Sequence, residues 1–267
     1  MNEVGFSREY TALQLRYNAL KERVANQIEM LHTLVFTTGP NIKARYMMFV
    51  GRLEYKVYEL KVEASRWKRR LALRQAALNR GETPDLAAIE ATLERLFAGF
   101  LETIRRHAEE ISENARLFSA ERLSAKEDTD VRVAYLNAVK KLHPDLNPNL
   151  PQAARDLWNE IQAAYARRDW AAVRLLAALA DSVVSGDEGF ASAPDAVAAL
   201  REACEKLEAK SNELKAESAR LQGEAPFVYR EFLADEEAVS ARQDELKAEI
   251  VELKAKVAAY EKEWNNG

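Results

Sequence analysis

The stretch that decides the fold spans residues 131–169 and reads VRVAYLNAVKKLHPDLNPNLPQAARDLWNEIQAAYARRD. Apolar residues recur at helical spacing on both sides of a proline-rich loop. The first set is Val131, Tyr135, Ala138 and Leu142, and the second set is Ala154, Trp158, Ile161 and Tyr165. Because each set covers one face of a helix, the sequence predicts an antiparallel helical hairpin whose loop covers residues 143–151.

The loop opens with His143-Pro144-Asp145. Pro144 has no N–H group, fixes its own φ angle and disfavours helix at His143. The sequence therefore predicts an exposed, rigid corner suited to recognition. A plainer interpretation is that Pro144 only ends a helix while His143 and Asp145 serve as local caps.

The hairpin resembles the second and third helices of a J-domain. Ala134-Tyr135, seven further residues and His143-Pro144-Asp145 have the order and spacing of that family, as have Trp158, Ile161 and Ala164-Tyr165 downstream. The resemblance covers residues 131–169 and implies a co-chaperone that recruits a DnaK-type ATPase chaperone and stimulates its ATP hydrolysis. The implied partner-binding residues are the loop residues His143, Pro144 and Asp145 with the basic residues Arg132, Lys140 and Lys141.

The chain departs from the J-domain pattern in three places. Leu136, Asn137 and Leu146 stand where that family commonly has basic residues, which predicts a thinner positive face. The usual first helix, with its Tyr-Leu-Gly turn, is absent as a separate element. We expect the segment near Leu117 and Phe118 to pack in its place.

Long amphipathic helices are expected before the hairpin, at residues 7–36, 41–80 and from residue 84 onward. Thr37-Thr38-Gly39-Pro40 is predicted to break the chain between the first two. Thr83 is the expected N-cap of the third, with Pro84 at its first position. Short connections favour antiparallel neighbours, so residues 1–122 are predicted to form an elongated three-helix bundle.

The predicted third region, residues 193–267, has coiled-coil spacing. Its heptad residues are Leu200, Leu207, Leu214 and Leu221 before a turn at 223–226, and Val239, Leu246, Leu253 and Tyr260 after it. Because Ser211 and Ser218 weaken the first arm, its own return arm is the simplest partner, although a homodimer fits the spacing equally well. Residues 185–189 and 192–194 are the expected hinge, which leaves 123–185 as the J-like region.

Composition favours an all-α protein and excludes several functional classes. Charged residues make up 31% of the chain, with only 9 Gly and 7 Pro. A net charge of −4 gives no general attraction to nucleic acid or membrane. The basic run at residues 66–70 is interpreted as a solvated helix face, because Trp67 continues the apolar stripe. With Cys204 alone and three scattered histidines, we expect no metal site, cofactor or catalysis.

No secretory signal or membrane-spanning run is visible, so a cytoplasmic location is expected. A second function fits the same sequence: a structural scaffold protein whose coiled-coil arms bind another protein or self-associate, with a J-like hairpin kept only for folding. The client protein is unknown under either hypothesis.

Overall fold

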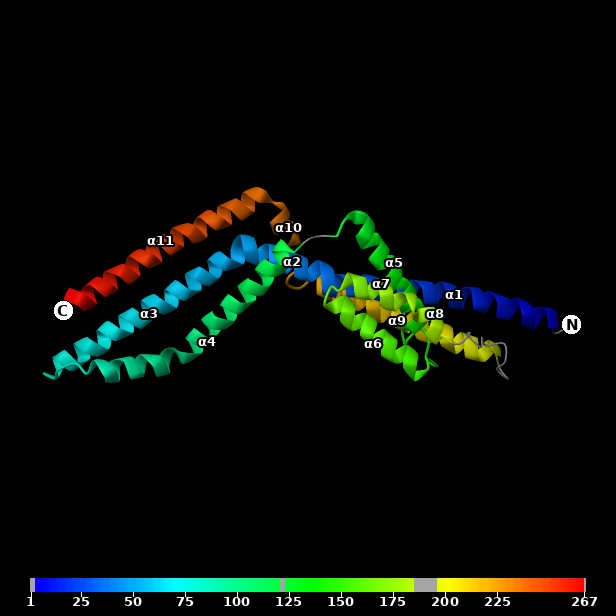
Figure 1. Ribbon diagram of the computed structural model, residues 1–267, viewed down its shortest axis with the longest axis horizontal. Coiled ribbons are helices and arrows are strands. Elements are labelled where there is room, and N and C mark those ends of the chain that lie inside the picture. The colour runs from blue at the N-terminus through cyan, green and yellow to red at the C-terminus, as the bar shows by residue number, and fades with distance from the viewer. Residues whose placement is uncertain (1–2, 121–122, 185–195, 267) are drawn as a thin grey trace. The chain divides into compact units, whose positions relative to one another are not determined.

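The computed structural model describes residues 3–120, 123–184 and 196–266, and all of its regular elements are helical (Figure 1). The predicted all-α class is therefore confirmed. The elements are α1 (Glu3–Thr33), η1 (Leu34–Thr38), α2 (Gly39–Tyr46), η2 (Met47–Gly51), α3 (Arg52–Asn79), α4 (Leu86–Ser119), α5 (Ala125–Leu142), α6 (Gln152–Ala166), α7 (Trp170–Ala178), α8 (Ala180–Val183), α9 (Ala196–Gln222), α10 (Tyr229–Ala234) and α11 (Glu236–Asn266), where η1 and η2 are π-helical turns. The expected hinge segments, 185–189 and 192–194, lie outside the described residues.

The predicted break at residues 37–40 is wrong, because residues 3–79 are helical without interruption. The π-helical turn η1 precedes Pro40, and the Gly39 N–H bonds back to the carbonyl of Leu34. A π turn opens the helix where the proline ring would clash with the preceding α turn and where its missing N–H removes a bond. Gly39 itself is tightly placed, since a Cβ atom there would lie 3.2 Å from the Phe227 ring.

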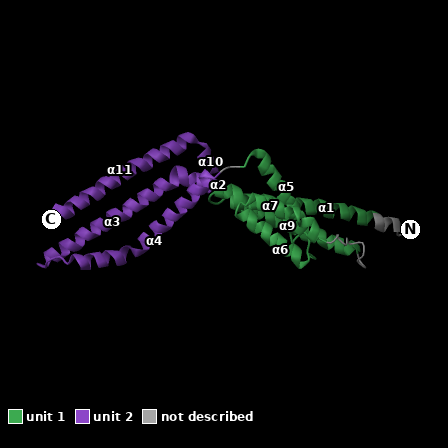
Figure 2. Ribbon diagram, in the orientation of Figure 1, with its two compact units in different colours: residues 1–40, 121–227 green, residues 41–120, 228–267 purple. Residues whose placement is uncertain are grey.

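The chain divides into two compact units (Figure 2). Unit 1 comprises residues 1–40 and 121–227, and unit 2 comprises residues 41–120 and 228–267. This division corrects the predicted domains 1–122, 123–185 and 193–267, because both the N-terminal and the C-terminal segments are shared between the units. The physical reason is the uninterrupted N-terminal helix, which contributes α1 to one unit and α3 to the other.

In unit 1, α1 pairs lengthwise with α9. Glu9 pairs with Arg201, and Arg16 pairs with Glu208. The residue numbers thus increase in the same direction along both helices, so the two run parallel. α9 therefore packs along α1, and the predicted pairing with its own return arm is replaced.

In unit 2, α3 pairs with both α4 and α11. Lys61 bonds to Glu249 and Arg74 to the carbonyl of Trp264, a parallel register with α11. Against α4 the order reverses, as Tyr55 bonds to Glu110 and Arg70 to Glu90, so the predicted antiparallel pair is confirmed. α4 begins two residues later than predicted, with Asp85 rather than Thr83 as its N-cap.

The α5–α6 hairpin lies at the centre of unit 1. All eight residues of the two predicted apolar faces are buried, and the rings of Tyr135 and Tyr165 lie 4.0 Å apart. α5 begins earlier than predicted because Ser124 and Glu127 form a reciprocal capping box. α1 packs against α5, and its residues Leu20, Val24 and Ile28 join the same core.

The expected replacement for the missing first J-domain helix was wrong. Phe118 packs its ring on Phe49 within unit 2, at 5.9 Å between centroids. In unit 1 both α1 and α7 pack against α5, and α1 precedes the hairpin by about a hundred residues in the chain. A contact at this sequence separation leaves no signal in the local pattern around the hairpin.

Candidate functional site

The loop at the tip of the hairpin is a hydrogen-bonded turn. His143 ends α5 in an extended conformation, with φ −72° and ψ 128°. Its carbonyl accepts bonds from the N–H groups of Leu146 and Asn147, and the Asp145 N–H donates to the imidazole Nδ1 of His143 at 3.1 Å. The turn thus orients His143 and Asp145 through its own backbone.

The loop is also anchored to the rest of unit 1. Leu146 and Leu150 are buried in the core, so Leu146 serves packing at the position where the family commonly has a basic residue. The Asn147 amide donates to the carbonyl of Lys140, and its oxygen accepts a bond from Lys21 of α1. These contacts give the loop little freedom to change conformation.

The three residues of the tripeptide differ in accessibility. Pro144 and Asp145 are exposed, while His143 is partly buried with its ring 5.2 Å from that of Trp158. Burial lowers the pKa of His143, against the opposing charge of Asp145. At neutral pH the loop therefore presents a neutral imidazole beside a carboxylate.

The three predicted basic residues on α5 are all engaged within unit 1. Arg132 bonds to Glu29 of α1 at 2.9 Å, and Lys140 to Glu22 of the same helix at 2.6 Å. Lys141 pairs with Asp181 of α8. The positive face implied by the J-domain resemblance is thus largely neutralised by carboxylates from elsewhere in the unit.

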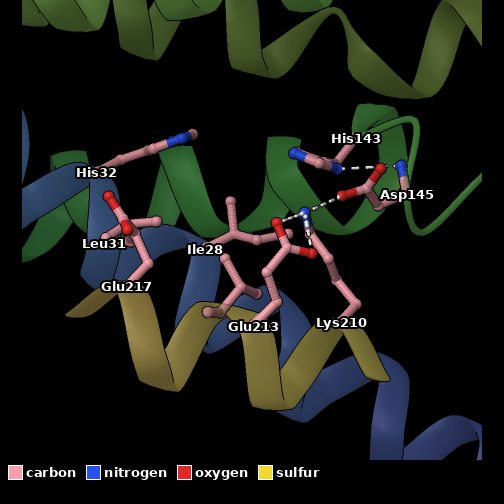
Figure 3. A pocket seen from close by; sticks show the side chains of 9 residues that line it. Ile28, Leu31, His32, His143, Asp145, Lys210, Glu213 and Glu217 are labelled. Atoms are coloured by element: carbon pink, nitrogen blue, oxygen red, sulfur yellow. Dashed lines mark hydrogen bonds and ion pairs between the residues drawn. The ribbon is translucent and has the colours of Figure 1, made fainter. Parts of the chain in front are cut away.

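Two helices contribute residues to this site that sequence reasoning missed. Lys210 of α9 bonds to Asp145 at 3.1 Å, and His32 of α1 lies across a cavity of about 180 Å³ from His143 (Figure 3). Burial, assisted by His143, lowers the pKa of His32 to about 4. The polar residues within the α9 heptads were the only available signal, and they show that α9 needed a partner without saying which one.

His32 belongs to a group of aromatic rings that packs against His143 of the loop. Its Nδ1 lies 2.7 Å from the hydroxyl of Tyr135, and its ring stacks on Trp158. Burial raises the pKa of Tyr135, so its hydroxyl stays protonated at neutral pH. A chain of rings therefore links α1 to His143 through Trp158.

In the described part of the chain, no group of three histidine, cysteine or carboxylate side chains is placed to hold a metal ion. Within residues 3–120, 123–184 and 196–266, no helix combines the length and the apolar character needed to cross a membrane. No protein-family model, curated protein or solved structure matches this chain.

Proposed function

We propose that unit 1 is a J-domain-like co-chaperone that recruits a DnaK-type chaperone and stimulates its ATP hydrolysis. The observation that carries the proposal is the loop itself: Pro144 and Asp145 are exposed at the tip of a tightly packed helical pair. The backbone of the loop holds this carboxylate in a fixed position, so the loop itself need not reorder when a partner binds.

The recognition chemistry follows from the charges at the tip. Asp145 offers a carboxylate to a cationic group of the partner, and His143 supports it by accepting the Asp145 N–H. Lys140 and Lys141 lie within the last turn of α5 and can contribute to steering. Because their carboxylate partners reduce the net field, we expect weak binding that falls further with salt.

The proposal is tested by single-turnover ATP hydrolysis with a DnaK-type chaperone from the same source. We expect wild-type protein to stimulate hydrolysis and His143→Gln to reduce it to the basal rate, because glutamine cannot reproduce the imidazole's place between Trp158 and the Asp145 N–H. His107→Gln, the same change in unit 2, is the matched control and retains stimulation. Circular dichroism of both variants checks that they are folded.

A second function, a structural scaffold, is favoured by a separate observation in unit 2. α4 leaves Leu96, Phe100 and Leu101 between 42% and 50% exposed along one stretch of helix. Apolar side chains grouped in this way are typical of surfaces that bind another protein. If His143→Gln stimulates hydrolysis as well as wild type does, the co-chaperone proposal fails and the scaffold function is favoured.

A further inference from the structure

The carboxylate at the tip of the loop already has a cationic partner inside unit 1. Lys210 of α9 reaches Asp145 at 3.1 Å and Glu213 at 3.2 Å (Figure 3). Its side chain is 28% exposed, less than that of Asp145 at 41%. Burial lowers the pKa of Lys210, but the bonds to Asp145 and Glu213 outweigh that effect and leave the pKa above its ordinary value. Lys210 thus stays charged at neutral pH.

The same pattern extends along α5. Glu29 and Glu22 of α1 bond to Arg132 and Lys140, the predicted docking cations. Every charge that the co-chaperone proposal needs is therefore paired with an opposite charge of this chain. A partner must displace these internal ions before it can form the same contacts.

The seam that holds α9 against α1 contains buried polar groups beside the loop. Ser211, next to Lys210, is 3% exposed in a row of buried positions otherwise filled by Leu200, Cys204, Leu207 and Leu214. Its hydroxyl and the buried Oε1 of Gln27 have no hydrogen-bond partner among the described residues. Buried polar atoms left unpaired destabilise the packed state. The Gln27 amide N–H donates to the Ser211 carbonyl, but the two unpaired oxygens leave polar groups here where neighbouring positions of the seam are apolar.

An open pocket lies beside this part of the seam. It has a volume of about 180 Å³, and Ile28 and Leu31 of α1 are among its lining residues (Figure 3). Leu214 of α9 also lines it. Glu213 also lines the pocket and its side chain is 68% exposed, so water reaches the seam at this point. Local opening is favoured where packing is poor and polar groups are unsatisfied.

We propose that the middle of α9 is a releasable cover, in which Lys210 occupies the site on Asp145 that a cationic group of the ATPase partner takes when α9 moves aside. The inference rests on the proposed co-chaperone function and adds regulation of that same site. In the closed form Lys210 occupies the binding site on Asp145. A partner or a ligand that draws α9 away from α1 exposes the loop.

The cover is tested in the full chain by substituting its cation. Lys210→Ala removes the ion pair with Asp145, and we expect about a two- to fivefold increase in affinity for the DnaK-type chaperone, the range of a partly exposed pair. Lys215→Ala removes an exposed charge from the same helix and is the matched control, with affinity unchanged. Amide hydrogen exchange of residues 207–214 is measured in parallel and is expected to be faster in Lys210→Ala alone.

A second variant tests the opposite direction. Ser211→Ala removes the unpaired hydroxyl and improves helix propensity, so it holds α9 more firmly and is expected to reduce stimulation and slow exchange at residues 207–214. Ser218→Ala makes the same change at a half-exposed position and controls for propensity.

The outcomes separate the two proposals. If His143→Gln abolishes stimulation while Lys210→Ala and Ser211→Ala match wild type, the co-chaperone function stands and the cover is overturned. If neither wild type nor Lys210→Ala stimulates hydrolysis although exchange shows α9 loosened, the co-chaperone function fails and the inference fails with it. Unchanged exchange in Lys210→Ala also overturns the cover.

Discussion

The two units hold their helices together in different ways. Unit 1 has a continuous core in which aromatic residues of α5 and α6 pack with aliphatic residues of α1, α7 and α9. The buried centre of unit 2 is much smaller, with Val50, Val57 and Leu246 surrounded by partly buried side chains. Unit 1 is therefore built around apolar burial, and unit 2 around the lengthwise pairing of its helices.

Polar and cation–π contacts have more weight in unit 2. The guanidinium of Arg70 lies 4.2 Å from the centroid of the Trp67 ring, and that of Arg74 lies 4.7 Å from Trp264. Such contacts form at partly exposed sites, whereas the core of unit 1 excludes water. The loop therefore belongs to the unit with the larger apolar core.

The largest effect is expected from truncating one tryptophan in each unit. Trp158→Ala removes a side chain that is 3% exposed and touches both His143 and Tyr135, so it should lower the free energy of unfolding of unit 1 by about 3 to 5 kcal/mol. Trp264→Ala removes a half-buried ring from unit 2 and should cost about 1 to 2 kcal/mol. Urea unfolding followed by circular dichroism measures both.

A protein with two compact units need not unfold in one step, so each variant is also examined by hydrogen exchange in the helices of its own unit. Exchange in α5 and α6 should respond to Trp158→Ala, and exchange in α3 and α11 to Trp264→Ala. An equal loss of unfolding free energy in the two variants would contradict the proposed difference, in which unit 1 depends on its apolar core and unit 2 on the pairing of its long helices.

The hairpin of unit 1 was predictable because its contacts are local. Tyr135, Trp158 and Tyr165 are brought together by two helices and one short loop, and each lies on an apolar face that the helical period reveals. The loop residues followed from the same pattern, since a proline after an apolar face marks the end of a helix.

The partners of the long helices were not predictable from the sequence. A heptad pattern shows that a helix has an apolar seam without specifying which seam it meets, and Leu207 and Leu246 fit either arrangement equally well. Gly39-Pro40 has the composition of a helix break, but the π turn before it lets the helix continue. That error removed the predicted antiparallel packing of residues 7–36 against residues 41–80, which form one continuous helical stretch instead.

The ion pairs around the loop were not predictable from the sequence for the same reason. Lys210 and Asp145 are far apart in the chain, and a lysine on a helix surface gives no indication of its partner. His32 is about a hundred residues from Tyr135 in the chain, so their contact could not be inferred from the local pattern either.

At acid pH the stabilities of the two units should differ further. The contribution of His32 alone should lower the free energy of unfolding of unit 1 by about 2 to 3 kcal/mol. The pKa of His32 is about 4 in the folded state and about 6.5 when unfolded. Above pH 6.5 the ring is neutral in both states and its contribution is complete. Between pH 6.5 and 4 the unfolded chain binds a proton that the folded chain excludes, so unit 1 loses stability as pH falls.

In unit 2 the groups that make the stability depend on pH are two glutamates, and their effect appears at lower pH. Hydrogen bonds from Arg70 and Lys43 lower the pKa values of Glu90 and Glu110, so their contribution is present above pH 4.5 and is lost below it. Urea unfolding of wild type and His32→Asn at pH 7, 5.5 and 4.5 tests this order. An equally steep loss in His32→Asn would show that another group governs the acid response of unit 1.

The smallest expected effect comes from removing one arginine from each unit. Arg132→Ala leaves Glu29, which is 6% exposed, with the Thr33 hydroxyl as its remaining bond, and should cost about 1 to 2 kcal/mol because a buried carboxylate loses its cation. Arg242→Ala leaves Glu54 with the Tyr46 hydroxyl, but that carboxylate is 33% exposed and water replaces the cation, so the cost should stay below about 1 kcal/mol.

A double variant decides whether burial is the cause of this difference. Glu29→Gln in the Arg132→Ala background removes the unpaired charge and should recover most of the lost stability, whereas Glu54→Gln in the Arg242→Ala background should recover little. Recovery in both units would mean that net charge, rather than the depth of each core, sets the energy of these pairs. Recovery in unit 1 alone would show that burial sets the energy of the ion pairs on α5. The same close packing holds the loop in place.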